Sequence, residues 1–204
     1  LSEFNVVLLG LAGTGKSASG NTILTAMNPE LTPSQLFVSR PSSTPVTSKC
    51  EFKVINVFGR LVRVIDTPDF LDDEIDTHTQ VEECKKYCQP GHCVVLLVIQ
   101  IGRITENERG ILERLENKLG WRIRESTIML LTHGENAKGQ EQRFIAERTY
   151  LDSMVKACGS RFHVFKNTSK KPKQVMELFK KIPDYKTIFP EFTEKPSHST
   201  CYMS

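Results

Sequence analysis

Short continuous runs of apolar residues recur along the chain at the spacing expected of buried β-strands. The first run, over residues 4–9, is rich in Val and Leu and leads directly into glycines, which is typical of a strand buried on both faces. Residues 51–58 alternate apolar and polar positions, Gly59-Arg60 offers a two-residue turn, and residues 61–65 resume as a strand. This region predicts a hairpin. Further runs at 93–99, 127–131 and 162–165 bring the expected number of strands to about six.

Segments with a helical pattern separate these strands. They cover residues 16–27, 77–87, 106–119, 140–157 and 173–181. In the third segment Thr105 and Glu108 form a capping box, and apolar residues recur three and four positions apart from Ile111 to Leu119. Strands that alternate with helices predict an α/β fold, with a mostly parallel six-stranded sheet, one antiparallel hairpin strand and helices on both faces. Ligands of such sheets bind at the carboxyl ends of the strands.

Two segments lack a regular apolar pattern. Residues 28–49 are rich in Ser, Thr and Pro and are long for a connecting loop, so we interpret them as a candidate mobile element. Residues 190–204 are polar, which is typical of a frayed tail or a linker. Because 204 residues suit one hydrophobic core, we expect a single domain over residues 1–189 and a tail over residues 190–204.

Composition narrows the functional classes only slightly. The formal net charge of +3 gives no reason to expect nucleic acid or an anionic membrane as the main partner. Six cysteines without a CxxC pair suit free thiols in a reducing cytoplasm, and the spacing of Cys84, Cys88, His92 and Cys93 matches no usual zinc pattern. The chain begins without Met and shows no secretory signal and no membrane span. We therefore expect a cytoplasmic fragment of a longer protein.

The segment between the first strand and the first helix carries a phosphate-binding pattern. Residues 10–17 are Gly-Leu-Ala-Gly-Thr-Gly-Lys-Ser and match G-x-x-x-x-G-K-[ST] in the strand-to-helix context of a P-loop. Glycines let successive amides turn toward phosphates, and the start of the helix adds positive potential. We expect Lys16 to bridge the β- and γ-phosphates. The expected nucleotide-binding residues of this segment are Gly10, Leu11, Ala12, Gly13, Thr14, Gly15, Lys16, Ser17 and Ala18.

Three oxygen-bearing side chains are the expected magnesium ligands. The Ser17 hydroxyl follows the P-loop lysine, which is the usual place for a hydroxyl that binds Mg²⁺. Asp66 ends the second strand of the hairpin, where a second acidic residue holds the ion, usually through water. Thr47, in the irregular segment, is expected to supply a hydroxyl and an amide, and Thr44 is the alternative. The predicted metal set is therefore Ser17, Thr47 and Asp66.

Residues after the last two strands are the candidates for reading the base. Thr132 to Glu135 emerge at the ligand edge of the sheet. A carboxylate that accepts from both N1-H and the exocyclic amine of guanine discriminates against adenine, so we assign this role to Glu135. His133 is expected to stack on the base or cap it, with a plain surface role as the alternative. Asn167, after the last strand, is expected to help close over the base, although a polar loop before the final helix explains it equally.

These motifs together resemble the GTPases of immunity-associated proteins, the GIMAP family, which is related to the chloroplast-import and septin GTPases. The resemblance spans most of the chain. It rests on residues 10–24, 46–50, 64–68, 132–135 and 161–167, and above all on residues 88–106, which resemble a box typical of that family. It implies a Ras-like P-loop GTPase fold with an AIG-type guanine-nucleotide-binding domain, GTP and GDP binding with magnesium, and an immune or defence setting. It also implies nucleotide-dependent association with itself or with similar domains, often at the cytosolic face of intracellular membranes through segments that this chain lacks.

One position departs from that family. GTPases of this kind carry Gly after Asp-Thr-Pro, whereas this chain has Asp69 and then Phe70, without a catalytic Gln. Two unit charges about 4 Å apart interact by roughly 1 to 4 kcal/mol between the dielectric limits of water and protein surface, so an Asp69 turned inward would oppose GTP more than GDP. The hypothesis is slow intrinsic hydrolysis and a preference for GDP.

Three functional interpretations follow from these motifs. The first is a GTP-dependent switch whose segment 28–49 orders around magnesium and the γ-phosphate, with Arg40, Arg63 or Arg103 as candidates to act across a dimer. The second is a hydrolysis-deficient GDP-binding scaffold module. The third, an ATP-using P-loop enzyme, is disfavoured because Thr132 to Glu135 resemble a guanine reader.

Overall fold

The chain folds around one six-stranded sheet. The computed structural model describes residues 3–40 and 46–192. The strands are β1 (Phe4–Leu9), β2 (Glu51–Val57), β3 (Arg60–Asp66), β4 (Cys93–Gln100), β5 (Thr127–Thr132) and β6 (Phe162–Val164). Their order is β2-β3-β1-β4-β5-β6, and among these strands only β2 and β3 pair in antiparallel fashion. The carboxyl ends of the parallel strands therefore meet at one edge of the sheet.

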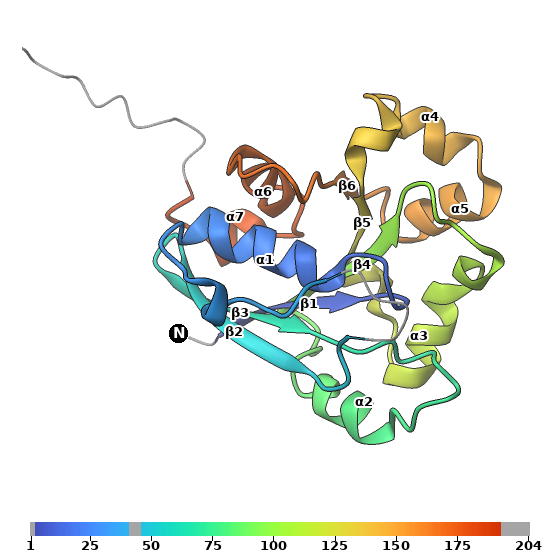
Figure 1. Cartoon of the computed structure of the whole chain (residues 1–204), viewed down its shortest axis with the longest axis horizontal. Coiled ribbons are helices and arrows are strands. Elements are labelled where there is room, and N and C mark those ends of the chain that lie inside the picture. The colour runs from blue at the N-terminus through green and yellow to red at the C-terminus, as the bar shows by residue number, and fades with distance from the viewer. Residues whose placement is uncertain (1–2, 41–45, 193–204) are drawn as a thin grey trace, which may run out of the picture.

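Helices cover both faces of the sheet (Figure 1), which confirms the predicted α/β architecture. One face carries α1 (Lys16–Met27), α6 (Lys173–Phe179) and α7 (Tyr185–Ile188). The other carries α2 (His78–Lys85), α3 (Ile111–Leu119), α4 (Glu141–Ala146) and α5 (Thr149–Ala157). Short 3-10 helices are η1 (Pro33–Gln35), η2 (Glu106–Glu108), η3 (Ile123–Ser126) and η4 (Gly134–Ala137).

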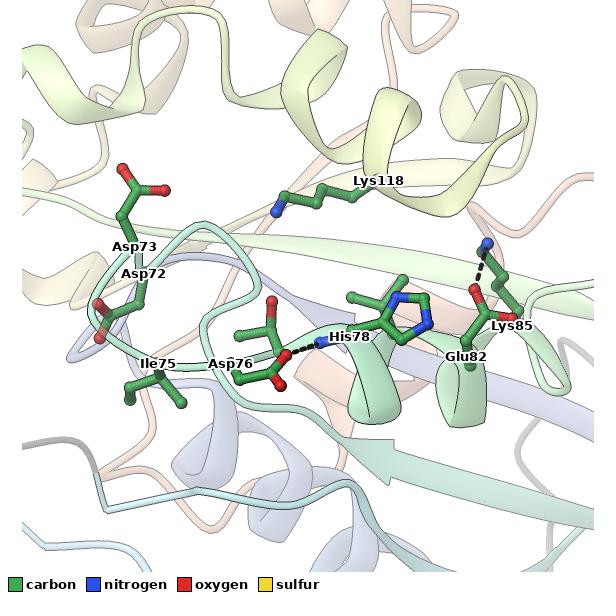
Figure 2. A pocket seen from close by; sticks show the side chains of 10 residues that line it. Asp72, Asp73, Ile75, Asp76, His78, Glu82, Lys85 and Lys118 are labelled. Atoms are coloured by element: carbon green, nitrogen blue, oxygen red, sulfur yellow. Dashed lines mark hydrogen bonds and ion pairs between the residues drawn. The ribbon is translucent and has the colours of Figure 1, made fainter.

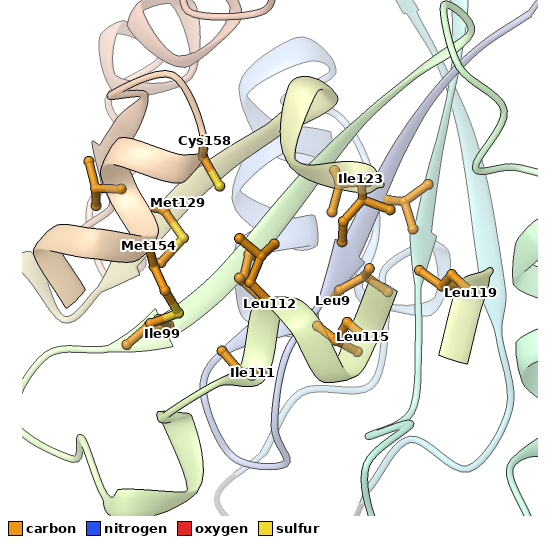
Figure 3. Packing of buried hydrophobic residues seen from close by; sticks show 14 of the residues in the cluster. Leu9, Ile99, Ile111, Leu112, Leu115, Leu119, Ile123, Met129, Met154 and Cys158 are labelled. Atoms are coloured by element: carbon orange, nitrogen blue, oxygen red, sulfur yellow. The ribbon is translucent and has the colours of Figure 1, made fainter. Parts of the chain in front are cut away.

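The two-residue period of β1 divides its side chains between two hydrophobic cores. Phe4, Val6 and Leu8 pack on the side of α1 and α6, whereas Val7 and Leu9 pack on the side of α2, α3 and α5. Figure 3 shows this second core, to which α3 contributes Ile111, Leu112, Leu115 and Leu119. Full burial of such a side chain contributes about 1.5–3 kcal/mol, so the strands that end at the site are held firmly.

The turn of the hairpin lies one residue earlier than predicted. Val57 pairs with Arg60, so the turn is Phe58-Gly59 rather than Gly59-Arg60. Both turn residues have positive φ, 50° and 78°, as a two-residue hairpin turn with the right-handed strand twist requires. Phe58 accepts this conformation because its ring packs on Phe192, with ring centroids 4.5 Å apart. A tertiary contact thus outweighs the local preference for Gly or Asn at this position.

Two of the predicted helices are each divided in the structure. Residues 106–119 form η2 and α3, because Gly110 adopts φ 72° and the capping box of Thr105 and Glu108 belongs to η2. Residues 140–157 form α4 and α5, which are separated at Arg148, where the backbone is extended and the guanidinium donates to the Phe144 carbonyl at 2.9 Å. Periodicity does not reveal these breaks, since both pieces direct apolar residues into the same core.

The end of the described chain packs against the first strand and the hairpin. The helix α7 was not predicted, and Phe189 just after it is fully buried, with its ring 5.6 Å from that of Phe4 and 5.5 Å from that of Phe179. Contacts continue to Phe192, three residues beyond the predicted domain end at residue 189. None of the helices in the described part of the chain has the length and apolar character needed to cross a bilayer.

Candidate functional site

The P-loop joins β1 to α1 at the carboxyl edge of the sheet. Gly10 has φ 149°, and a Cβ atom there would lie 2.6 Å from the carbonyl oxygen of Val98, so a side chain does not fit against β4. α1 begins at Lys16 after the left-handed Gly15, without a capping side chain. Among the described residues no acceptor takes the backbone amides of residues 13–18. These amides are therefore available to an anion.

Lys16 folds back into the loop that precedes it. Its ammonium donates to the carbonyl oxygens of Gly10 and Leu11, at 2.9 and 2.7 Å, and the residue is 7% exposed. Burial lowers the pKa of Lys16 to about 8, while the charges of Asp66 and Asp69 act in the opposite direction. A desolvated cation beside a cradle of amides is suited to binding phosphate.

The structure brings Ser17, Thr47 and Asp66 together, as a metal site requires. The Ser17 hydroxyl donates to Asp66 Oδ2 at 2.5 Å, and Thr47 Oγ1 lies 3.2 Å from Ser17 Oγ and 3.4 Å from Asp66 Oδ2. Asp66 is 2% exposed. Burial raises the pKa of Asp66, and this rise is opposed by the hydrogen bond from Ser17, the charge of Lys16 and the hydrogen bond from Thr47.

This set of oxygen atoms fits a magnesium ion. Mg²⁺ prefers hard oxygen ligands such as hydroxyls, carboxylates and water. Asp66 Oδ1 is buried and has no hydrogen-bond partner among the described residues, so the carboxylate keeps an unused acceptor. Thr44, the alternative to Thr47, lies outside the described residues.

Asp69 is turned toward the P-loop. Its Oδ2 atom accepts a hydrogen bond from the Ala12 amide at 3.1 Å, and its Oδ1 atom accepts one from the Leu71 amide at 2.9 Å. Phe70, the next residue, is 1% exposed and belongs to the hydrophobic core. The departure at position 69 was visible in the sequence, but the contact with Ala12 was not, because the two residues are 57 positions apart.

The base-side residues follow β5 at the same edge. The Thr132 hydroxyl donates to the Thr14 carbonyl at 2.6 Å, which ties the end of β5 to the P-loop. No motif in the sequence predicted this bond. Gly134 is buried, and a Cβ atom there would lie 2.4 Å from a β6 side chain. The side chains of His133 and Glu135 are each 46% exposed, with Nδ1 of the former 3.5 Å from Oε1 of the latter. Glu135 therefore presents its carboxylate at the strand ends.

Asn167 contacts α1 rather than its base-side neighbours. Its Oδ1 atom accepts from the Thr22 hydroxyl at 2.8 Å, and its Nδ2 atom donates to Ser19 Oγ at 3.2 Å. These bonds fix the loop after β6 against the helix that begins at the P-loop. A direct contact between Asn167 and the base stays a prediction.

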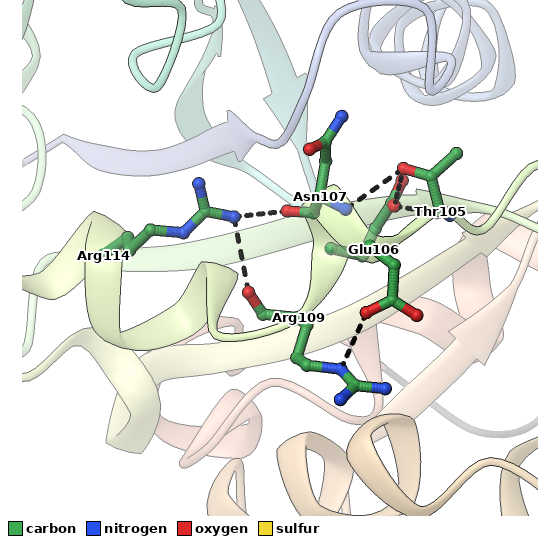
Figure 4. Close-up of polar contacts among 6 residues, drawn as sticks. Thr105, Glu106, Asn107, Arg109 and Arg114 are labelled. Atoms are coloured by element: carbon green, nitrogen blue, oxygen red, sulfur yellow. Dashed lines mark hydrogen bonds and ion pairs between the residues drawn. The ribbon is translucent and has the colours of Figure 1, made fainter.

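The connection from β4 to α3 begins at the same edge and is fixed by its own polar contacts (Figure 4). The amide and hydroxyl of Thr105 both donate to Glu108 Oε2, at 2.7 and 2.8 Å. Arg114 donates to two carbonyl oxygens of this connection. Arg103, by contrast, is exposed and forms no ion pair with a described residue.

Comparison with protein families decides where this arrangement belongs. A family model described as "AIG1 family" matches residues 4–195, which is most of the chain. The chain belongs to the AIG1 family. Its structure is thus an AIG1-type G domain, and the resemblance to the GIMAP proteins is confirmed by the relatives described next.

AIG1 relatives come from animals and plants. The chain is 30% identical over 198 residues to mouse GTPase IMAP family member 8, covering 95% of this chain and 28% of the relative. It is 33% identical over 192 residues to the human protein of that name, covering 88% and 28%. It is 31% identical over 188 residues to Immune-associated nucleotide-binding protein 4 of Arabidopsis thaliana, covering 85% and 55%. The chain thus spans about a quarter to about half the length of these relatives.

Solved structures of similar shape are also G domains. Arabidopsis thaliana Toc33 in complex with GDP and Mg²⁺ has a TM-score of 0.57 at 19% identity, covering 82% of this chain and 72% of Toc33. The G domain of the T. maritima FeoB iron transporter has a TM-score of 0.56 at 17% identity, covering 90% and 99%. These similarities, together with the observed sheet, confirm the Ras-like P-loop GTPase fold for the AIG1 domain.

Proposed function

We propose that this AIG1 domain is a guanine-nucleotide-binding switch that takes up GTP and GDP with Mg²⁺. The observation that carries the proposal is the convergence of Ser17, Thr47 and Asp66 beside the buried Lys16. The free amides of residues 13–18 and the ammonium of Lys16 bind the phosphates. When bound, the metal ion neutralises phosphate charge, with Ser17, Thr47 and Asp66 as its protein ligands or as partners of its waters.

The switch resides in the segment that carries Thr47. This residue is the point where the connection between α1 and β2 reaches Asp66, at 3.4 Å, and the hydroxyl of Ser17, at 3.2 Å. Loss of the γ-phosphate would remove one attractive partner from this segment and release it, as in other GTPases. The neighbouring Cys50 is tied to α2, since its amide donates to Gln80 Oε1 at 2.8 Å. A change at Thr47 therefore has a direct route to α2.

The base is selected by Glu135. Its exposed carboxylate accepts from the two guanine N-H groups and becomes buried by the base itself, so adenine would leave it unpaired. We propose that His133, on the same turn, lies against the base. Toc33 structures with GDP and with GMPPNP, each with Mg²⁺, support guanine-nucleotide binding by domains of this shape.

Hydrolysis in the isolated domain is proposed to be slow. Asp69 and the buried Phe70 occupy the positions after Asp66-Thr67-Pro68, so the Gln that orients the attacking water in other GTPases has no counterpart there. The second candidate function, a hydrolysis-deficient GDP-binding scaffold, is favoured by the same two residues. A measurement of phosphate release from GTP at high protein concentration distinguishes the two candidate functions. The switch predicts a release rate per molecule that rises with protein concentration, and the scaffold predicts no release.

Self-association is part of the proposal. Dimerization is described as important for the GTPase activity of Toc33, and an Arg-to-Ala mutant of that protein is dimerization-deficient. Of the three arginines considered, Arg63 is committed to Glu3 and to the rings of Phe52 and Tyr87. Arg40 and Arg103 are both exposed, and Arg103 follows the carboxyl end of β4, at the edge of the sheet that carries the P-loop. We propose Arg103 as the residue that acts across the dimer.

The bounds of the domain and its location in the cell are also part of the proposal. We assign the nucleotide-binding unit to residues 1–189 and extend its packing to Phe192. Residues 193–204 lie outside the described residues and keep the interpretation of a polar tail or linker. A cytoplasmic location suits the free thiols of Cys50, Cys84, Cys88, Cys93 and Cys158; Cys201 lies outside the described residues. Contact with intracellular membranes and a defence role would come through other segments of a longer protein.

The test is a set of titrations with GDP, GTP and ATP on nucleotide-free protein, each with and without Mg²⁺. Guanine nucleotides are expected to bind at least about tenfold more tightly than ATP, and Mg²⁺ is expected to strengthen GTP binding. Ser17→Ala should abolish the Mg²⁺ dependence without abolishing GDP binding, while Ser153→Ala, on α5, serves as the control. Tight binding of ATP, or no binding of any nucleotide, would exclude the proposal.

A further inference from the structure

The carboxylate of Asp69 stands between two backbone amides at the mouth of the P-loop. One oxygen accepts from the Ala12 amide at 3.1 Å and the other from the Leu71 amide at 2.9 Å. The first of these donors belongs to the loop whose amides face phosphates, and the second belongs to the chain that leaves β3. An anion of the protein itself is therefore bound by the phosphate-binding loop.

The charge of Asp69 acts on the lysine that is expected to hold the terminal phosphate. Lys16, which in P-loop proteins reaches the β- and γ-phosphates, is attracted by the charges of both Asp66 and Asp69. Asp66 belongs to the predicted magnesium set and accepts from the Ser17 hydroxyl, whereas Asp69 is held by the Ala12 amide. A terminal phosphate would bring further negative charge next to Asp69, whereas the phosphates of a diphosphate lie deeper in the cradle.

We propose that Asp69 is a built-in competitor of the terminal phosphate, which makes the domain select nucleoside diphosphates and admits a triphosphate only when Asp69 is displaced. The inference rests on the proposed nucleotide-binding function and deepens it. Asp69, the residue that departs from the family pattern, then determines whether the domain holds a diphosphate or a triphosphate.

The structure leaves room for the displacement. Residues 69–76, which we call the acidic strap, begin with Asp69. Within the strap Asp72 accepts a hydrogen bond from the Glu74 amide at 2.9 Å, and at its end Asp76 accepts one from the His78 amide at 3.0 Å. The strap borders a cavity of about 350 Å³ between itself, α2 and α3 (Figure 2). Lys118 of α3 lines this cavity together with Asp72, Asp73 and Asp76 of the strap. Displacement of Asp69 would break its hydrogen bond with Ala12, and this cavity lies beside the segment that would then move.

The experiment compares Asp69→Asn and Asp69→Gly with the wild type. Asparagine keeps the shape and an acceptor for Ala12 but removes the charge, and glycine removes the side chain altogether. Asp73→Asn is the control, because it makes the same change of net charge on an exposed residue of the strap. Dissociation constants for GDP and for a non-hydrolysable GTP analogue are measured with Mg²⁺ by calorimetry, and the thermal midpoint of each variant verifies folding.

The wild type and Asp73→Asn are expected to prefer GDP. Both Asp69 variants should gain about tenfold or more in affinity for the GTP analogue, with GDP affinity changed less than about threefold. Beryllium fluoride, which occupies the place of a terminal phosphate beside GDP, should bind to the Asp69 variants and not to the wild type.

An unchanged ratio of the two affinities in both Asp69 variants, with GDP still bound, would overturn the inference and leave the proposed function intact. Equal gains in Asp73→Asn would also overturn it, since the effect would then come from net charge alone. Failure of the wild type and all variants to bind any guanine nucleotide would overturn the proposed function itself.

Discussion

The phosphate side and the base side of this site are built in different ways. On the phosphate side Lys16 and Asp66 are 7% and 2% exposed, and both are already bonded to their neighbours. On the base side His133 and Glu135 are each 46% exposed, at a turn held by the buried Gly134. One half is preorganised, and the other half is completed by the ligand.

The difference predicts where binding energy and selectivity reside. Buried charges act at a low effective dielectric and lose no ordering entropy on binding, so the phosphate side should dominate affinity. An exposed carboxylate becomes desolvated only when a base covers it, and it then penalises any base that cannot pair with it. Changes on the base side should therefore alter which nucleotide binds more than they alter the stability of the fold.

The largest effect is expected from the phosphate side. Lys16→Ala should weaken both GDP and GTP binding by about 100-fold or more, because a charge-assisted contact to two phosphates is lost. Calorimetric titration measures this change. Lys156→Ala, which removes the same charge from the exposed surface of α5, should leave binding unchanged. A loss of less than about threefold in Lys16→Ala would contradict the preorganised phosphate side.

A smaller effect and a change of preference are expected at Glu135. Glu135→Gln should weaken GDP binding by about 30-fold, since the amide accepts only one of the two guanine N-H bonds. The same variant should gain affinity for xanthosine diphosphate, whose carbonyl accepts the new N-H donor. Glu141→Gln, the same change at a half-buried residue of α4, is the control. Retained guanine preference in Glu135→Gln would place the base reader elsewhere.

The pKa of Lys16, lowered to about 8 by burial, predicts a pH dependence. The ammonium loses its proton above that pH, so GDP affinity should fall by about tenfold between pH 7 and pH 9. Folding is not weakened by this group over the same range: its folded pKa is below its unfolded value of 10.5, so the cost of burying the charge is relieved as pH rises from 8 to 10.5. A GDP affinity that does not change between pH 7 and pH 9 would show that Lys16 stays charged throughout this range.

The smallest effect is expected at Asn167. Asn167→Ala removes the bonds to Thr22 and Ser19 and should lower the free energy of unfolding by about 1 kcal/mol, with GDP affinity changed less than about threefold. Denaturant unfolding and GDP titration measure the two quantities on the same sample. Asn117→Ala, on the exposed side of α3, is the control. A loss of GDP affinity equal to that of Glu135→Gln would instead show that Asn167 contacts the base.

Much of the fold was predictable because its signals are local. Strands such as β1 and β4 are continuous apolar runs, and the P-loop is a pattern of eight consecutive residues, Gly10 to Ser17. The breaks at Gly110 and Arg148 were missed, since a helix interrupted by one residue keeps its apolar face. The turn at Phe58 was misplaced because its ring contact with Phe192 lies far along the chain.

The candidate site shows the same division. The sequence named Lys16, Ser17, Thr47, Asp66 and Glu135 from motifs, since the chemistry of phosphate, magnesium and guanine restricts which residue types can serve and in what order along the chain. It did not show that Thr132 bonds to the P-loop or that Asn167 turns to α1. Those contacts depend on the register of neighbouring strands, which places residues from separate segments within hydrogen-bonding distance.

By itself, then, the sequence determined the kind of domain and the residue types that face a nucleotide, because strand periodicity and the P-loop pattern are properties of short segments. Only the tertiary structure decided that Asp69 faces Ala12 across 57 residues and that Glu135 stays exposed while Asp66 is buried. The physical reason is that burial and direction belong to the packed sheet edge, where the ends of several strands meet, and no single segment carries that information.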